Sequence, residues 1–298
     1  MPVAAVIGLG IMGGGAAASL KRAGFTVRGC DVSGPALAKF KDRGGIACTS
    51  AAEAAEGADV VFVFVMDASQ TELVLFGAGG VVDTAAPGTA VICCATVPPD
   101  IASDIGERLA KRGLLPLDAP ISGGGKKALM GEVTVIAAGS PEAFEAAGPA
   151  LDAISAKVFR LGETPGLGTR AKMINQLLGG IHNVATAEAM TLGIASGLDP
   201  ATLAEVVTAS AGSSWMFAQR APRIAAGDYA APSLLSIFVK DLAIVTKEAE
   251  AAGMSLPLTE VARAQYQAAA DAGFGGEDSA ALAKVYAERA GVKLPEVD

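Results

Sequence analysis

The feature that most constrains this chain is a glycine-rich segment that directly follows an apolar run near the N-terminus. Val3–Gly8 has the composition of a buried strand, and a helical pattern begins at Gly13. The segment between them reads Gly8-Leu9-Gly10-Ile11-Met12-Gly13. In a strand–loop–helix unit the first glycine permits a tight turn, the second lets the backbone approach a pyrophosphate, and the third lets the helix pack close to the strand. We therefore expect residues 8–13 to bind a dinucleotide cofactor, with the helix N-terminus facing its phosphates.

An acidic residue supports this interpretation. Asp31 ends a second predicted strand, Thr26–Asp31, 18 residues beyond Gly13. A carboxylate at this point accepts hydrogen bonds from the adenosine ribose hydroxyls and repels a 2′-phosphate. Because the residues after Asp31 are Val, Ser and Gly and none is basic, the sequence predicts NAD rather than NADP.

The first half of the chain alternates apolar, β-branched runs with helical segments. Continuous apolar strands that alternate with helices indicate a parallel sheet covered on both faces. The predicted strands are Val3–Gly8, Thr26–Asp31, Val60–Met66, Ala90–Ala95, Leu114–Asp118, Thr134–Ala138 and Val158–Leu161. The predicted helices between them include Gly13–Ala23, Gly34–Arg43 and Asp100–Arg112.

The pattern changes after Gly162, where a turn-rich stretch precedes a long helical pattern from Thr169 to about Ser196. Further helices are predicted at Pro200–Ser210, Met216–Ala226, Pro232–Ala252 and Pro257–Asp271, with no strand among them. We predict an α/β fold, with a Rossmann-type doubly wound sheet in an N-terminal NAD-binding domain at 1–163. An all-α domain for substrate binding and oligomerisation follows at 164–298.

Composition narrows the possible functions. A formal net charge of −8 argues against a nucleic-acid partner, which requires a basic surface. No window contains 18 apolar residues in a row, so no membrane partner is expected. The chain starts directly in a strand without the features of a signal peptide, which predicts a cytoplasmic protein.

Histidine and cysteine usage restricts the chemistry further. The single histidine, His182, lies among apolar helix residues, so neither a histidine triad nor a three-histidine zinc site is expected, and no metal is predicted. The cysteines are expected to be buried, reduced thiols. They are Cys30, Cys48, Cys93 and Cys94.

Three further motifs follow in order. They read Asp118-Ala-Pro-Ile-Ser122-Gly-Gly124, Gly166-Leu-Gly168-Thr-Arg-Ala-Lys172-Met-Ile-Asn175-Gln176 and Phe238-Val-Lys240-Asp241-Leu242. Together with residues 8–13, this set resembles the signature of the β-hydroxyacid dehydrogenase family over nearly the whole chain. The family includes 3-hydroxyisobutyrate dehydrogenase, tartronate semialdehyde reductase and 6-phosphogluconate dehydrogenase. The resemblance implies NAD-dependent oxidation of a small hydroxy acid.

Within this family the second half is similar to the L-threonate dehydrogenases. The similarity lies in Ala211–Phe217, in Gly227–Leu242 and in Gly273–Asp278. It implies oxidation of L-threonate to 2-dehydro-L-erythronate, with 3-hydroxyisobutyrate oxidation and tartronate semialdehyde reduction as open alternatives. A non-catalytic module that binds a nicotinamide cofactor is the alternative from another class. Lys172 and the Ser122–Gly124 segment argue against that alternative, and Lys172 also disfavours an imine reductase.

Alcohol oxidation requires a hydride acceptor and a base for the hydroxyl proton. In the absence of a suitable histidine or metal, a lysine tuned by burial or by a neighbouring positive group is a credible base. Lys172 stands where the family places its catalytic lysine. Asn175 and Gln176 share its helix face and are predicted to bind substrate. Gln176 stands where many relatives have an asparagine that binds the substrate hydroxyl.

The resemblance also assigns the remaining binding residues. Ser122, Gly123 and Gly124 follow a strand at the carboxyl edge of the sheet, where ligands of open α/β sheets collect, and are expected to hold the substrate carboxylate. Thr96 and Lys240 are expected to contact the cofactor.

Four positions are less clearly assigned by the motifs. Met66 and Asp67 stand where many relatives have Leu-Pro beside the nicotinamide, and we carry them over as cofactor-binding although the residue types differ. Lys127 and Trp215 have no assigned role. A homodimer or homotetramer is expected, with the long Ala-, Gly- and Leu-rich helix a candidate for the subunit contact.

Overall fold

The computed structural model describes residues 1–230 and 234–296. It contains two compact units, Met1–Lys172 and Met173–Asp298. The division falls inside the long helix α8 (Leu167–Ala195), which begins in the first unit and continues into the second. The domain boundary drawn from the sequence, between residues 163 and 164, stays a prediction.

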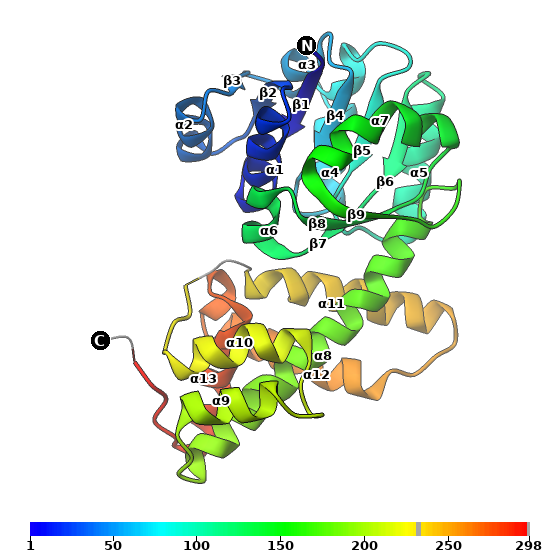
Figure 1. The fold of residues 1–298 in the computed structure, drawn as a ribbon. Helices are drawn as coiled ribbons and strands as arrows, with labels where there is room; N and C mark the ends of the chain where they lie inside the picture. Colours follow the sequence, from blue (N-terminus) through cyan, green and yellow to red (C-terminus); the bar gives the residue numbers. More distant parts are fainter. Residues whose placement is uncertain (231–233, 297–298) are drawn as a thin grey trace. The chain divides into compact units, whose positions relative to one another are not determined.

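The first unit is built on a six-stranded parallel sheet in the order β3-β2-β1-β4-β5-β6 (Figure 1). This is the strand order of the dinucleotide-binding Rossmann fold. The strands are β1 (Val3–Ile7), β2 (Thr26–Cys30), β3 (Ile46–Ala47), β4 (Val60–Val63), β5 (Ala90–Cys93) and β6 (Leu115–Asp118). Five of them are confirmed predictions, whereas the two-residue strand β3 is too short to give a sequence pattern.

Two predicted strands belong to a separate sheet, which corrects the expectation that they extend the parallel one. This sheet contains β7 (Ile121–Ser122), β8 (Val133–Ala137) and β9 (Ser155–Arg160). Strand β7 runs antiparallel to β8, and β9 runs parallel to it. Burial alternates along β8, as in a strand with only one face in the core, whereas all four residues of β4 are buried.

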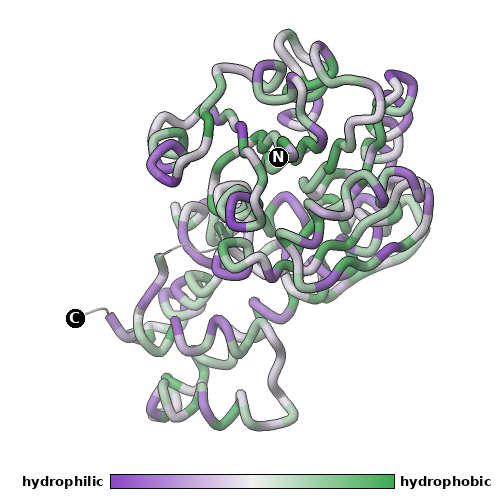
Figure 2. The backbone as a smooth tube through the Cα atoms, turned by 45° about the horizontal axis from the view of Figure 1, so that its top comes forward, coloured by the Kyte–Doolittle hydropathy of each residue, from purple (hydrophilic) through white to green (hydrophobic). Residues whose placement is uncertain are grey.

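Both faces of the six-stranded sheet are covered by helices. Val6, Phe62 and Ile92 point to one face and join a core with α1, α2 and α7, while Ile7 and Val63 point to the other and join a core with α3, α4 and α5. The helices are α1 (Ile11–Arg22), α2 (Gly34–Asp42), α3 (Ala51–Ala55), α4 (Ala68–Phe76), α5 (Pro99–Ala110) and α7 (Pro141–Ile154). Figure 2 shows the central strands near the N-terminus as hydrophobic segments, as burial on both faces requires.

The second unit is helical. Its helices after α8 are α9 (Pro200–Thr208), α10 (Trp215–Ala225), α11 (Leu235–Ala251), α12 (Pro257–Asp271) and α13 (Leu282–Ala290). Within the described part of this unit there is no strand, and a single isolated bridge pairs Leu234 with Asp278. The ring of Phe238 stacks on that of the fully buried Tyr266 at 5.2 Å, in the core of the unit.

The predicted helix Pro232–Ala252 corresponds to α11, which begins at Leu235 because its N-cap, Leu234, is extended. Pro232 itself lies outside the described residues. No helix among those described is long and apolar enough to cross a membrane.

Helix α6 (Gly124–Met130) packs directly on α1. A Cβ atom added at Gly15 would lie 2.8 Å from the backbone nitrogen of Leu129 and 2.9 Å from the side chain of Ala128. The Ser19 hydroxyl donates to the Ala128 carbonyl at 3.0 Å. The glycine-loop helix α1 and the helix that follows Ser122 are therefore held in contact through their backbones.

We predict that Gly15→Ala destabilises the protein by about 1–3 kcal/mol, because the added methyl group has no space against the backbone of α6. Urea unfolding measures the loss. Gly212→Ala is the control: a Cβ at Gly212 meets nothing within 4 Å, and the change is expected to stay within about 0.5 kcal/mol. Equal stabilities for Gly15→Ala and the parent protein would contradict the packing argument.

Candidate active site

The glycine-rich loop has the geometry that its sequence predicts. Gly8 adopts φ +88°, and a Cβ there would lie 2.2 Å from the carbonyl oxygen of Phe64. A Cβ at Gly13 would lie 1.9 Å from the Gly8 carbonyl oxygen, whereas one at Gly10 would meet nothing within 4 Å. The first and third glycines are thus required by packing, and the second faces open space. A pocket of ≈ 400 Å³ opens beside Leu9, Gly10 and Ile11.

The Asp31 carboxylate is bonded to the same loop. Its Oδ2 accepts from the backbone N–H of Leu9 at 2.6 Å, and its Oδ1 accepts from that of Ser33 at 2.7 Å. Each carboxylate oxygen can accept more than one hydrogen bond, so both can still receive ribose hydroxyls. Asp31 therefore both supports the loop and can recognise a 2′-hydroxyl, and the residues present fit NAD.

Three of the other predicted cofactor residues, Met66, Asp67 and Thr96, follow the carboxyl ends of β4 and β5. Met66 is half exposed, and its backbone N–H donates to Gln70 Oε1 at 2.9 Å. Asp67 is the N-cap of α4, where its Oδ1 accepts from the Gln70 N–H at 2.8 Å. Thr96 follows the end of β5 by three residues. Capping gives Asp67 a local structural role, which the spacing of Asp67 and Gln70 could have revealed.

The segment Ser122–Gly124 joins β7 to α6. Ser122 pairs with Thr134 at the end of the small sheet. Gly123 and Gly124 adopt φ values of +137° and +75°, which side chains strongly disfavour. A Cβ added at Gly125 would lie 2.3 Å from Ile11 Cγ2. The fold thus brings the expected carboxylate-binding segment next to the cofactor loop.

Lys172 lies in the second turn of α8 and is 8% exposed. The first turn of the same helix is held by Asp118, which ends β6 and is 4% exposed. Asp118 is the first residue of the motif that contains Ser122. The sequence predicted a role for Ser122 but none for Asp118. An acidic residue at the end of an apolar strand was the only sequence signal for it, and that signal does not show its hydrogen-bond partners.

A second carboxylate organises the polar residues of the second unit. Asp241, which is almost fully buried, accepts from Gln176 Nε2 at 2.6 Å and pairs with Lys240 Nζ at 2.6 Å. Gln176 Oε1 in turn accepts from Asn175 Nδ2 at 3.0 Å. One chain of contacts therefore links Asn175, Gln176, Asp241 and Lys240. Within it, Asp241 fixes the orientation of the Gln176 amide.

The two residues without an assigned role, Trp215 and Lys127, lie in different surroundings. Phe217 is buried in the helical core, whereas Trp215 at the start of α10 is half exposed. The side chain of Lys127 lies against Gly123, since a Cβ there would be 2.9 Å from its Cδ. The four cysteines are free thiols, as predicted, but only Cys48 and Cys94 are buried, and Cys30 and Cys93 are partly exposed. Burial raises the pKa of Cys30 to about 11 and that of Cys93 to about 12, so both stay protonated and unreactive at neutral pH.

Known families and proteins match the chain over almost its full length. Residues 3–162 match the NAD-binding domain of 6-phosphogluconate dehydrogenase, and residues 166–286 match the NAD-binding domain of NADP-dependent 3-hydroxyisobutyrate dehydrogenase. An L-threonate dehydrogenase of Cupriavidus necator is 49% identical over 97% of this chain and 97% of its own. One of Escherichia coli O6:H1 is 44% identical over 97% of this chain and 95% of its own.

The chain belongs to the β-hydroxyacid dehydrogenase family. A solved structure agrees: a 3-hydroxyisobutyrate dehydrogenase from Salmonella typhimurium has a TM-score of 0.91 and 41% identity, covering 96% of this chain and 100% of that one. The protein is thus an NAD-dependent hydroxyacid dehydrogenase that acts on a small hydroxy acid. The Rossmann-type sheet followed by a helical region is the fold of this family.

We predict that Asp31→Ala narrows the preference for NAD over NADP. Loss of the carboxylate removes the repulsion of a 2′-phosphate, and it also removes the acceptor for the Leu9 N–H, so NAD binding should weaken about 10-fold without being abolished. The ratio of kcat/KM for NAD and NADP measures the change.

Asp42→Ala is the matched control, because it removes an exposed carboxylate from α2 of the same unit. It should leave the ratio unchanged. A ratio for Asp31→Ala equal to that of the parent enzyme would show that Asp31 does not discriminate between the cofactors.

Proposed function

We propose that this dehydrogenase oxidises L-threonate to 2-dehydro-L-erythronate, with Lys172 as the acid/base group. The observation that carries the substrate assignment is the 49% identity to an L-threonate dehydrogenase over 97% of both chains. The Salmonella protein named 3-hydroxyisobutyrate dehydrogenase, at 41% identity, makes 3-hydroxyisobutyrate the second candidate substrate.

Lys172 would remove the proton from the hydroxyl group that is oxidised. NAD, when bound at residues 8–13 and Asp31, supplies the acceptor for the hydride. Lys172 is the one buried lysine among the described residues, and its position excludes most of the water that would compete for the proton. In the reverse direction the ammonium of Lys172 returns the proton to the forming alkoxide.

The other predicted residues would hold the substrate and the cofactor. Ser122, Gly123 and Gly124 offer a hydroxyl and backbone N–H groups without side chains in the way, which suits a carboxylate. Asn175 and Gln176 are neutral amides that can orient a hydroxyl without taking its proton. Asp241 would keep Gln176 in one orientation through the 2.6 Å hydrogen bond.

Besides residues 8–13 and Asp31, we propose cofactor contacts from Met66, Asp67, Thr96 and Lys240. We also propose a homodimer or homotetramer without nucleic-acid or membrane partners, and domains that divide at residue 163. The four free thiols are consistent with the cytoplasm, where thiols stay reduced.

The acid/base role predicts the behaviour of two variants. Lys172→Ala should lower kcat by about 10²–10⁴-fold, the usual contribution of a positioned acid or base. Lys172→Arg should recover little of this, because a guanidinium keeps its proton at working pH. Steady-state NADH formation measures both, and NAD titrations should show nearly unchanged affinity.

Lys111→Ala is the control, since this lysine, the C-cap of α5, has a side chain 75% exposed. Its turnover should match that of the parent enzyme. If Lys172→Arg kept most of the parent activity, Lys172 would act only as a cation that binds the substrate. The base would then be another residue, with Lys240 the first candidate.

A substrate panel tests the proposed function directly. L-threonate, its C2 and C3 stereoisomers and 3-hydroxyisobutyrate are assayed by NADH absorbance, and tartronate semialdehyde by NADH consumption. L-threonate should give the highest kcat/KM. A higher value for 3-hydroxyisobutyrate or tartronate semialdehyde would overturn the substrate assignment while keeping the reaction class.

A further inference from the structure

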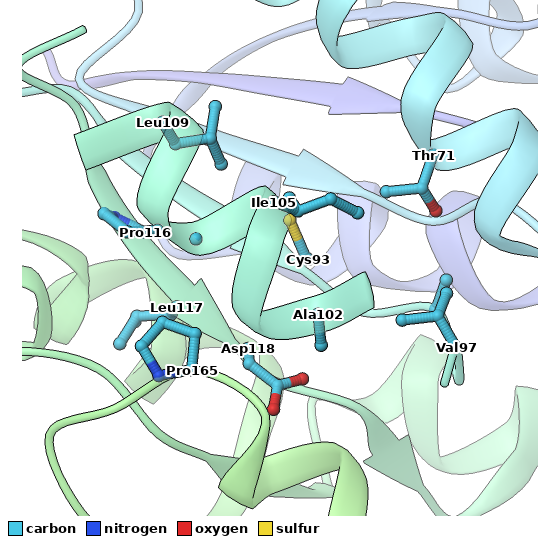
Figure 3. Close-up of a pocket in the computed structure, with 12 residues that line it drawn as sticks. Thr71, Cys93, Val97, Ala102, Ile105, Leu109, Pro116, Leu117, Asp118 and Pro165 are labelled. Carbon is cyan, nitrogen blue, oxygen red and sulfur yellow. The ribbon is translucent and has the colours of Figure 1, made fainter. Parts of the chain in front are cut away.

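A buried carboxylate from a distant strand satisfies the N-terminus of α8. Asp118 Oδ2 accepts from the backbone N–H groups of Gly166 and Thr169, both at 2.8 Å, and Oδ1 accepts from the Thr169 hydroxyl at 2.7 Å. Figure 3 shows the Asp118 side chain at the end of β6, with Pro165 and Ala102 near it. The carboxylate thus bonds to two residues that lie 48 and 51 positions further along the chain.

These bonds fix where the helix begins. A helix capped by its own serine or aspartate satisfies its free N–H groups wherever it lies, because the cap moves with it. A cap supplied from β6 satisfies them only when the helix starts at this one place. Burial raises the pKa of Asp118, while the hydrogen bonds from Thr169 and Gly166 oppose that shift. Displacing the helix would leave a buried carboxylate without partners, which is costly.

Two further contacts seat the same turn. A Cβ added at Gly168 would lie 2.4 Å from the Asp118 carbonyl oxygen and 2.7 Å from that of Ile136, so the helix backbone rests against β6 and β8. The Ser103 hydroxyl of α5 donates to the Pro165 carbonyl at 2.9 Å. The start of α8 is therefore held from three elements of the first unit.

Lys172 follows Thr169 by three residues, a rise of about 4.5 Å along the helix axis, and lies on the same face. A shift of the anchored turn therefore moves Lys172 with it. We propose that Asp118, with Thr169 as its partner, is a positioning residue that sets the location of the Lys172 amine. This inference rests on the proposed acid/base role of Lys172.

The test compares variants in two backgrounds. Asp118→Asn replaces an oxygen acceptor with a donor, and Thr169→Val removes the hydroxyl at nearly constant volume. With Lys172 intact, each should lower kcat, Asp118→Asn by about 10–100-fold, since a displacement of about 1 Å has effects of that size. NAD affinity should stay within about twofold, because the proposed pyrophosphate and ribose contacts do not involve α8. Thr169→Ser keeps the hydroxyl and should keep most of the activity.

In the Lys172→Ala background neither variant should lower the residual turnover further, because the group being positioned is gone. Such non-additivity distinguishes positioning from a general structural role. Asp104→Asn on α5, with a side chain 59% exposed, is the control for changing a carboxylate to an amide and should leave kcat unchanged. Circular dichroism and thermal melting establish that each variant is folded.

The possible outcomes are distinguishable. If Asp118→Asn fails to fold, Thr169→Val and Thr169→Ser are compared instead, because they differ in whether the hydroxyl that bonds to Asp118 is present. An unchanged kcat in the folded variants with Lys172 intact, or an equal fold-loss in both backgrounds, would overturn the positioning role. If Lys172→Ala itself keeps the parent turnover, the proposed acid/base function fails, and that result is seen before any Asp118 variant is made.

Discussion

Contacts between backbones that leave no space for a side chain determine where the functional segments of the first unit lie. Gly13 places α1 against the Gly8 turn, Gly15 places α6 against α1, and Gly168 places α8 against β6. Each contact joins a segment with a proposed ligand role to a neighbour, and each would be broken by a single methyl group. The cofactor loop, the Ser122–Gly124 segment and the turn before Lys172 are therefore seated by one type of interaction.

Carboxylates that accept hydrogen bonds, two of them buried, complement these contacts by fixing polar groups. Asp31 bonds the cofactor loop, Asp118 the start of α8, and Asp241 the amide of Gln176. A carboxylate offers several acceptor sites, so one residue can hold two segments at once. The net charge of −8 is thus compatible with an anionic substrate. Several carboxylates already accept hydrogen bonds from the protein, and the groups proposed to bind the substrate are a lysine, a hydroxyl and backbone N–H groups.

Much of the fold could be predicted because burial leaves a pattern in the sequence. The apolar runs that became β1, β4 and β5 are buried on both faces, and the change to helical periodicity after Gly162 marks the helical region. Strands β3 and β7 have two residues each and leave no pattern. The separate sheet of β7, β8 and β9 was missed because pairing partners depend on tertiary contacts that a strand pattern does not encode.

The candidate site was likewise predictable only in part. Motif spacing predicted roles for residues 8–13, Asp31 and Lys172, but hydrogen bonds between residues about 50 positions apart, such as those of Asp118, have no local signature. The central claim is that Lys172 takes the proton while Ser122–Gly124 hold the carboxylate, and a crystal structure with NADH and L-threonate bound tests it most directly. Lys172 Nζ is expected within about 2.6–3.2 Å of the hydroxyl on the carbon that faces the nicotinamide, and the carboxylate is expected on Ser122 and Gly123. A complex in which another side chain contacts that hydroxyl and Lys172 does not would contradict it.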